Sequence, residues 1–250
     1  MKVLGPLLDG LFPARCVGCG APPRALCPAC LARARPAGEP PPPPGLDWWA
    51  AAFSYEGAVR EALARVKYRN VRSALPVLGP ALVRCLQADL PGPVDAVTWP
   101  PTTSSRRRGR GFDQAEHLAR AVGRSLGVPV RSCLVRPAGP AQTGRSANAR
   151  RRGLAFGPGP AAVAGQRVLV VDDVATTGAT LAAAARALRS AGARWVGGAT
   201  VARTALRVGG PEGYGSVAAG SSPSDGAPLF AVSRGSASGR GPPSGGARDW

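Results

Sequence analysis

The sequence predicts an α/β fold, a parallel sheet flanked by helices, between a small cysteine-rich module and a disordered tail. Between residues 48 and 204, strand-like runs alternate with helix-like amphipathic patterns. Four of the six cysteines lie within residues 1–35. Residues 205–250 are mainly glycine, serine, proline and alanine with almost no periodicity, which is typical of disorder. The proline run at 36–47 predicts a stiff polyproline II linker between the module and the α/β domain.

The composition excludes some classes of protein and leaves others open. The formal net charge of +18, from 32 basic and 14 acidic residues, would by itself indicate a nucleic-acid or anionic partner. However, only Lys2 and Lys67 are lysines and isoleucine is absent, a bias typical of GC-rich genomes that raises the arginine content everywhere. No run reaches the roughly 18 apolar residues of a membrane span, and no signal peptide is recognisable. We therefore expect a cytoplasmic protein without a membrane span.

The first half of the α/β region has the pattern of a strand, two helices and a second strand. Val59, Leu63 and Val66 recur at helical spacing and predict one apolar helix face. Pro100 and Pro101 are expected to end the second strand, because proline cannot donate to a sheet. The predicted elements are a strand at 50–55, helices at 57–67 and 74–87, and a strand at 94–99.

The second half continues the alternation and contains the central strand. Asp113, with Glu116 three residues later, predicts the N-terminus of a helix in a capping-box arrangement. The uninterrupted apolar run 168–171 predicts a strand that is buried on both faces. Gly192 is expected to end the last helix. The predicted elements are a helix that begins after Asp113, strands at 130–135 and 168–171, a helix at 180–191 and a strand at 195–202.

Two C-x2-C pairs, separated by seven residues, predict a metal site near the N-terminus. The pairs are Cys16 with Cys19 and Cys27 with Cys30. Zinc prefers four thiolates at tetrahedral corners, and each C-x2-C turn presents two sulfurs to one ion. Two disulfides or four unconnected thiols are the alternatives, and a cytoplasmic location disfavours disulfides. A closed four-cysteine site has no open position, so we expect a structural zinc ion in a zinc-ribbon-like module.

The most informative segment is 168–180, a buried strand followed by two carboxylates, a loop of small residues and a helix. Ligands of open α/β sheets bind at the carboxyl ends of the strands, and a helix N-terminus favours a phosphate. Asp172 and Asp173 suit hydrogen bonds from sugar hydroxyls. An ordinary core strand followed by a polar helix cap is the alternative. The residues expected to surround the phosphate are Thr176, Thr177, Gly178, Ala179 and Thr180.

This segment resembles the phosphoribosyl-pyrophosphate (PRPP) binding motif of type I phosphoribosyltransferases, a hydrophobic strand followed by D-D-x-x-T-T-G-x-T. The resemblance implies that Asp172 and Asp173, the expected catalytic residues, contact the ribose hydroxyls of PRPP. It also implies that the loop 175–180 holds the 5′-phosphate. Mg²⁺ is implied as a cofactor that accompanies PRPP, carried largely by its pyrophosphate oxygens.

Further motifs narrow the resemblance. The two C-x2-C pairs, Lys67-Tyr68, the segment 108–114 and the segment 142–144 together resemble the ComF family. That family is linked to competence and DNA uptake in bacteria, which implies competence-machinery proteins or single-stranded DNA as partners. Asp113 departs from the family pattern, which usually has asparagine there.

The basic residues are concentrated in two arginine-rich loops. Residues 101–160 hold 12 basic and 2 acidic residues and so carry +10 of the total charge of +18. Arginine suits bidentate contacts with phosphates, so these loops are expected to close over the pyrophosphate end of PRPP. Contact with a single-stranded nucleic acid and an ordinary solvated basic surface are the alternatives. The lid candidates are Arg106, Arg108, Arg110, Gln142 and Arg150.

Two functional hypotheses follow from these observations. The first is a phosphoribosyltransferase that acts by positioning and charge neutralisation and releases pyrophosphate. The second is a non-catalytic accessory protein of competence that binds PRPP or single-stranded DNA. The acceptor substrate is not predicted, because no acceptor pocket is recognisable in the sequence.

Overall fold

The computed structural model describes residues 14–204, apart from 40, 70–71, 104–107, 109–110 and 138–154. The chain divides into two compact units, Met1–Gly209 and Gly210–Trp250. The predicted disordered tail at 205–250 lies outside the described residues. None of the helices in the described ranges is both long enough and apolar enough to cross a membrane.

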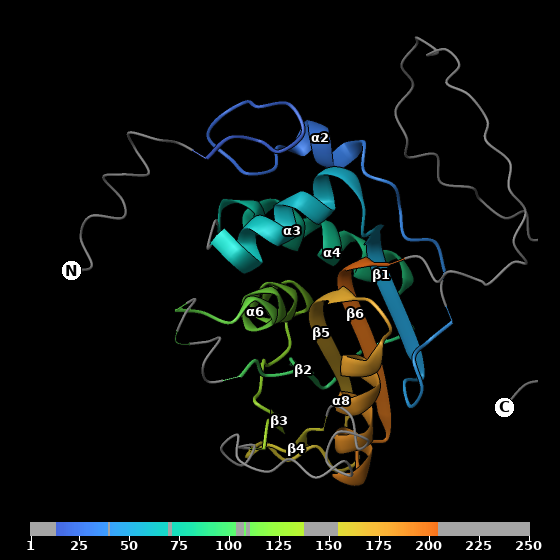
Figure 1. The fold of residues 1–250 in the computed structure, drawn as a ribbon. Coiled ribbons are helices and arrows are strands. Elements are labelled where there is room, and N and C mark those ends of the chain that lie inside the picture. Colours follow the sequence, from blue (N-terminus) through green and yellow to red (C-terminus); the bar gives the residue numbers. More distant parts are fainter. Residues whose placement is uncertain are drawn as a thin grey trace, which may run out of the picture. The chain divides into compact units, whose positions relative to one another are not determined.

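A sheet of four parallel strands forms the centre of the first unit, in the order β1-β6-β5-β2 (Figure 1). Each strand includes most of its predicted segment; the ends of β1, β2 and β6 differ by one or two residues, and β5 is extended. Parallel neighbours require crossover connections, which the helices supply. The strands are β1 (Trp48–Ser54), β2 (Ala96–Thr98), β5 (Arg167–Ala175) and β6 (Trp195–Arg203).

Helices cover both faces of this sheet. Leu169 and Val171 of β5 belong to one hydrophobic cluster with residues of α3, α4 and α6, whereas Val168 and Val170 belong to a second cluster with residues of α8. The strand is therefore buried on both faces, which confirms the prediction from its continuous apolar run. The longer helices are α3 (Gly57–Arg69), α4 (Leu75–Asp89), α6 (Gln114–Leu126) and α8 (Ala179–Ser190), and the 3-10 helix η1 (Arg72–Ala74) precedes α4.

The predicted N-cap of α6 is confirmed. A carboxylate oxygen of Asp113 accepts hydrogen bonds from the backbone N–H groups of Ala115 and Glu116, at 3.1 and 3.5 Å. The Glu116 side chain pairs with Arg120, one turn further along the helix. Gly127, with a φ of +69°, ends the helix in the left-handed conformation that glycine adopts at low cost.

The strand predicted at 130–135 is only partly correct. Residues Leu134–Val135 form β3, which pairs antiparallel with β4 (Gly157–Pro158) in a separate two-stranded sheet. Val130 makes one isolated parallel bridge to Val97 of β2. Between these two points the N–H of Cys133 donates to the carbonyl of Arg131 at 3.0 Å, and this tight turn interrupts the extended chain.

The central strand is longer than predicted. The apolar run ends at Val171, but the pairing of β5 with β6 continues through Asp172 and Val174 to Ala175. Backbone hydrogen bonds to the neighbouring strand do not depend on side-chain polarity, so they extend the strand through both carboxylates. Asp172 and Asp173 therefore lie within the strand, with side chains that point to opposite faces of the sheet.

The described part of the proline-rich run packs against the sheet. The N–H of Ala37 donates to Ala52 at 3.4 Å, and its carbonyl accepts from Arg203 Nε at 2.9 Å. Leu46 is buried in the cluster beside α8. An Asp47 carboxylate oxygen accepts from the N–H of Val196 at 2.7 Å. These contacts hold the run on the domain, and the predicted boundaries of the domains remain predictions.

The cysteine-rich module packs on α3. It contains the short helix α2 (Pro28–Ala32), which lies beside α3 (Figure 1). Leu26 and Leu31 are buried in the same cluster as Val59 and Leu63 of α3. The N–H of Ala25 also donates to the hydroxyl of Ser73 at 3.1 Å, which ties the module to η1, just before α4. The module therefore shares a hydrophobic core with one face of the α/β domain.

Candidate functional site

The four predicted metal ligands lie together. The sulfur atoms of Cys16, Cys19, Cys27 and Cys30 are all within 4.8 Å of one another, and those of Cys19 and Cys27 are 3.8 Å apart. Four thiolates around a tetrahedral zinc ion with Zn–S bonds near 2.3 Å are about 3.8 Å apart. All six cysteines of the chain are free, so the disulfide alternative is not realised. This arrangement can hold a metal ion.

Backbone N–H groups favour a thiolate at the centre of this cluster. The N–H groups of Gly18 and Cys27 both lie 3.4 Å from the Cys16 sulfur. Burial raises the pKa of Cys16, but hydrogen bonds from the backbone of Cys19, Cys27 and Gly18 outweigh it and lower the pKa to about 6. Contacts with the sulfurs of Cys27 and Cys16 raise the pKa of Cys30 to about 12. One thiol of the cluster is thus prepared for deprotonation, as metal binding requires.

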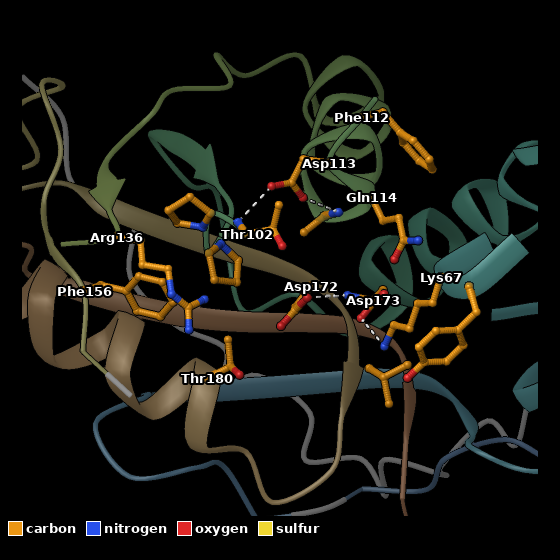
Figure 2. A pocket seen from close by; sticks show the side chains of 15 residues that line it. Lys67, Thr102, Phe112, Asp113, Gln114, Arg136, Phe156, Asp172, Asp173 and Thr180 are labelled. Carbon is orange, nitrogen blue, oxygen red and sulfur yellow. Dashed lines mark hydrogen bonds and ion pairs between the residues drawn. The ribbon is translucent and has the colours of Figure 1, made fainter. Parts of the chain in front are cut away.

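A second site is a cavity of about 290 Å³ at the carboxyl ends of β2 and β5 (Figure 2). Open α/β sheets bind their ligands at this edge. The cavity is lined by both carboxylates of β5 and by residues from six other segments. Its lining residues are Lys67, Tyr68, Pro100, Pro101, Thr102, Phe112, Asp113, Gln114, Ala115, Arg136, Phe156, Asp172, Asp173, Val174 and Thr180.

Strand β5, which carries Asp172 and Asp173, divides this cavity into two halves. Since successive residues of a strand face opposite sides, Asp172 continues the side of Val170 and α8, and Asp173 continues the side of Val171 and α6. The first half contains Thr180, Phe156 and Arg136, and the second contains Lys67, Phe112 and Gln114 (Figure 2). The two carboxylates thus present oxygen acceptors to different parts of one cavity.

Lys67 neutralises only one of the two carboxylates. Its Nζ lies 3.0 Å from Oδ1 of Asp173, while an Asp172 carboxylate oxygen accepts the backbone N–H of Asp173 at 2.8 Å. Burial and the Asp173 carboxylate raise the pKa of Asp172 to about 8, against the opposing effects of that N–H and of Lys67. Asp172 therefore holds its proton more tightly than an ordinary aspartate.

The loop after β2 is fixed by the residue that caps α6. The second carboxylate oxygen of Asp113 accepts the N–H of Thr102 at 3.0 Å, while the first caps the helix. Burial raises the pKa of Asp113, and the three N–H groups that it accepts oppose this shift. Asp113 thus holds the segment that follows β2 against the start of α6, and this contact closes one side of the cavity.

The predicted phosphate loop turns from β5 into α8. Thr176 and Thr177 are exposed, and the N–H of Ala179 points to the Thr177 hydroxyl at 3.4 Å. Gly178 has a φ of +74°, and a Cβ added there would lie 2.8 Å from Cγ of Pro43. Only glycine fits this position without strain, because the chain is in the left-handed region and the proline-rich run crosses closely.

Only some of the predicted site residues line the cavity. Asp172, Asp173 and Thr180 line the cavity, while Ala175 is buried at the end of β5. Arg108 is exposed and is not among the lining residues. The loop residues Thr176, Thr177, Gly178 and Ala179 form the turn beside the cavity. The lid candidates Arg106, Arg110, Gln142 and Arg150 lie outside the described residues.

Several lining residues were not predicted as site residues. They are Lys67 in α3, Gln114 in α6, Arg136 directly after β3 and Phe156 directly before β4. The guanidinium of Arg136 lies over the Phe156 ring, 5.7 Å from its centroid. Lys67 and Gln114 carried a sequence signal, as parts of the Lys67-Tyr68 pair and of the segment 108–114 in the family resemblance. Arg136 follows a predicted strand and Phe156 has no signal, so their approach to the cavity depends on the tertiary fold.

Residues 109–217 match the family model of the phosphoribosyl transferase domain. The match covers less than half of the chain but includes α6, the motif strand β5, the loop and α8. Together with the parallel sheet flanked by helices, it defines the fold class as that of a type I phosphoribosyltransferase. It supports phosphoribosyl transfer as the general activity of this class.

No curated protein sequence matches the chain significantly. Similar solved structures include "the allosteric regulatory enzyme of purine biosynthesis", at 25% identity and a TM-score of 0.38, covering 52% of this chain and 26% of that chain. Glutamine PRPP amidotransferase from B. subtilis has 26% identity and a TM-score of 0.38, covering 51% and 26%. Purine phosphoribosyltransferase from Pyrococcus horikoshii has 18% identity and a TM-score of 0.32, covering 52% and 72%. The chain thus spans about a quarter of the first two structures.

Proposed function

We propose that this chain is a phosphoribosyltransferase that binds PRPP with Mg²⁺ and transfers the phosphoribosyl group to an acceptor, with release of pyrophosphate. One observation carries the proposal. Asp172, Asp173 and Thr180 meet in one cavity at the carboxyl edge of the sheet, within the stretch that matches the phosphoribosyl transferase domain. A core strand with a polar helix cap would not require two carboxylates beside an open cavity.

The residues divide between the two ends of the sugar phosphate. The loop 175–180 holds the 5′-phosphate at the start of α8, where backbone N–H groups favour an anion. Asp172 and Asp173 accept hydrogen bonds from the ribose hydroxyls. Carboxylate and phosphate oxygens are the ligands that Mg²⁺ prefers, so these two side chains fit a metal that is bound together with PRPP. When bound, the ion supplies positive charge to the departing pyrophosphate.

In the reaction, a nitrogen lone pair of the acceptor forms a bond to C1 of the ribose while the C1–O bond to pyrophosphate breaks. Pyrophosphate leaves with the electron pair of that bond, and the proton that the nitrogen loses passes to solvent. The protein contributes by positioning the ribose and excluding water. Arg106, Arg108, Arg110, Gln142 and Arg150 are proposed as lid residues that neutralise the leaving pyrophosphate.

The finer assignments belong to the same proposal. We assign the chain to the ComF family, with a cytoplasmic location and a link to competence. The four cysteines hold a structural zinc ion, for which the sulfur separations are suitable. The domains are proposed as the zinc module at 1–35, the linker at 36–47, the phosphoribosyltransferase domain at 48–204 and the disordered tail at 205–250.

The test is PRPP binding and pyrophosphate release with Mg²⁺ across purine, pyrimidine and ammonia acceptors. The wild type is expected to release pyrophosphate with at least one acceptor. The double variant Asp172→Asn, Asp173→Asn is expected to lose PRPP binding, while Asp89→Asn on the exposed side of α4 is the matched control. PRPP binding without release would support the non-catalytic accessory role instead. Unchanged PRPP affinity in the double variant would overturn the site assignment.

A further inference from the structure

One strand of the sheet carries a buried polar side chain that the proposed function does not use. Between its end residues Trp195 and Arg203, strand β6 consists of valine, glycine and alanine apart from Thr200. Thr200 is 0% exposed, and its hydroxyl oxygen has no hydrogen-bond partner among the described residues. A buried hydroxyl without a partner is costly, and valine, which has the same shape and favours strands, would avoid that cost. The core therefore holds a hydroxyl whose presence needs a reason.

Another buried threonine of this sheet shows what such a hydroxyl can do. Thr98 of β2 is also 0% exposed, and its hydroxyl oxygen accepts the backbone N–H of Cys133 at 3.3 Å. Thr98 thus has a structural role in the turn before β3. Within the described ranges these are the two fully buried threonines, and of the two Thr200 is the one without a partner.

The register of the sheet places Thr200 beside Asp172. The two residues are partners in the parallel pairing of β5 with β6, and on its other side Thr200 is paired with Ala51 of β1. Neighbouring strands lie about 4.8 Å apart, and the side chains of paired residues point to the same face of the sheet. Ala51 offers no polar side-chain atom. The carboxyl group of Asp172 is therefore the polar side chain next to the Thr200 hydroxyl across the sheet.

A second polar atom on this face also lacks a partner. Trp49 of β1 is paired with Gly198, two residues before Thr200, so its side chain and that of Thr200 point to the α8 side. The indole Nε1 of Trp49 is buried without a hydrogen-bond partner among the described residues. An indole N–H only donates, whereas a hydroxyl both donates and accepts. A contact with Trp49 would use a lone pair of the Thr200 oxygen and would leave the hydroxyl proton for Asp172.

Asp172 can accept a hydrogen bond from this side. One of its carboxylate oxygens accepts the backbone N–H of Asp173 at 2.8 Å, and Lys67 pairs with Asp173 rather than with Asp172. An ionised carboxylate has about four acceptor positions, so this N–H uses only one of them. Thr200 is not among the residues that line the cavity. A bond from its hydroxyl would therefore hold the carboxylate from the core and leave the cavity free for a ligand.

We infer that Thr200 is a positioning residue for Asp172: its hydroxyl bonds to the Asp172 carboxyl group and orients it toward the ribose hydroxyls of the ligand. A hydroxyl suits both forms of this group, since it donates to the carboxylate and accepts from the protonated carboxyl. Thr200 acts through Asp172 and contacts no ligand itself. The inference rests on the proposed function, in which Asp172 accepts the ribose hydroxyls, and adds a residue from outside the segment 168–180.

Two measurements test the inference, one without a ligand and one with two ligands. A double-mutant cycle of Thr200→Val and Asp172→Ala, followed by urea unfolding of the full-length chain, measures whether the two side chains interact. Thr98→Val in the same cycle with Asp172→Ala is the matched control. Ribose 5-phosphate and inorganic phosphate are titrated calorimetrically into the wild type and the threonine variants, because only the first ligand has ribose hydroxyls. The threonine variants are Thr200→Val, Thr200→Ser and Thr98→Val.

The unfolding constant of the double variant Thr200→Val, Asp172→Ala is expected to differ by at least about threefold from the value that independent effects would give. Thr98→Val and Asp172→Ala should act independently. Thr200→Val should weaken the binding of ribose 5-phosphate about fivefold and leave the binding of inorganic phosphate unchanged. Thr200→Ser retains the hydroxyl and should therefore keep the affinity of the wild type, and Thr98→Val should change neither affinity.

Independent effects of Thr200→Val and Asp172→Ala would overturn the inference, and so would an equally large interaction of Thr98→Val with Asp172→Ala. An unchanged affinity of Thr200→Val for ribose 5-phosphate would also overturn it. An equal loss in Thr200→Ser, or for inorganic phosphate, would do the same, because side-chain shape or loop packing would then be responsible. A wild type that does not bind ribose 5-phosphate would instead contradict the proposed function, and the cycle would still decide whether Thr200 and Asp172 interact.

Discussion

The ammonium of Lys67 lies 3.0 Å from Oδ1 of Asp173, and this ion pair joins α3 to the central strand. Both side chains are largely buried, at 22% and 10% exposure, so water screens the pair less than a surface pair. Asp172, one residue earlier, has no such direct partner among the described side chains, and its pKa is raised. One lysine from outside the PRPP motif thus pairs with one of the two carboxylates and only partly offsets the rise in the pKa of the other.

Replacement of Lys67 should shift the titration of the carboxylates. Its positive charge is one of the influences that lower the pKa of Asp172, so Lys67→Met should raise that pKa further above about 8. The measurement is a carboxyl carbon NMR titration of the free protein. Arg65→Met is the matched control, because Arg65 lies on the same helix and pairs with Glu61. An Asp172 midpoint that does not move in Lys67→Met would contradict this account of the site.

Asp172 should also make stability depend on pH. Its pKa is about 8 in the folded chain, compared with an ordinary value of 3.8, so the folded state holds the proton more tightly. The stability that this proton contributes is fully present below about pH 4 and is lost as the pH rises through 8. Asp172→Asn should therefore stabilise the protein relative to the wild type at pH 8, by up to about 5 kcal/mol, and much less at pH 4.

Urea unfolding at both pH values measures this difference. The control is Asp89→Asn, because Asp89 is exposed and its substitution should have nearly the same effect at pH 4 and pH 8. If Asp172→Asn lowered the free energy of unfolding at pH 8, the carboxylate would be satisfied in the free protein and not strained by burial.

The sequence was a good guide to the fold wherever the signal was local. The helix that begins after Asp113 was predicted from the spacing of Asp113 and Glu116, and Asp113 is the N-cap of α6. The strand predicted at 130–135 is only partly correct, because a tertiary contact interrupts it. The hydroxyl of Thr98, on β2, accepts the N–H of Cys133 at 3.3 Å and stabilises the turn that interrupts the strand. No pattern within 130–135 encodes that contact.

The candidate site shows the same limit. Asp172, Asp173 and Thr180 could be found because nine consecutive residues carry the whole motif. Gln114 belongs to the segment 108–114 of the family resemblance, but its burial could not be predicted, because a glutamine at the start of a helix is ordinarily a surface residue. Its burial depends on the packing of α6 against the sheet and on the contact of Asp113 with Thr102. Sequence motifs thus pointed to Lys67 and Gln114 without showing that they line one cavity.

Metal removal should unfold the cysteine-rich module selectively. About one zinc ion per chain is expected in the wild type, and Cys19→Ser should lose it, because a three-thiolate site binds more weakly. Loss of the metal should cost at least about 2 kcal/mol, because the module has little core of its own. Leu26 and Leu31 pack on α3, so faster amide exchange at these residues reports the loss.

The control for this prediction is Cys85→Ser. Cys85 lies on α4, outside the sulfur cluster, and its substitution should leave the zinc content unchanged. A full zinc content in Cys19→Ser, or loss of zinc in Cys85→Ser, would contradict the assignment of the four ligands.

Gly178 offers a test of the contact between the phosphate loop and the proline-rich run. An alanine there adopts a φ of +74° and places its Cβ 2.8 Å from Cγ of Pro43. Gly165→Ala is the matched control, since Gly165 has a φ of +69° and no atom lies within 4 Å of its added Cβ. The backbone conformation alone should cost about 1 kcal/mol in both variants. The clash should add roughly a further 1 to 2 kcal/mol in Gly178→Ala only.

Combining Gly178→Ala with Pro43→Ala should recover much of that difference, because the ring that blocks the Cβ is removed. Urea unfolding gives the three stabilities, and PRPP affinity should fall in Gly178→Ala and recover with them. Equal destabilisation in Gly178→Ala and Gly165→Ala, with no recovery in the double variant, would mean that the run does not press on the loop in solution.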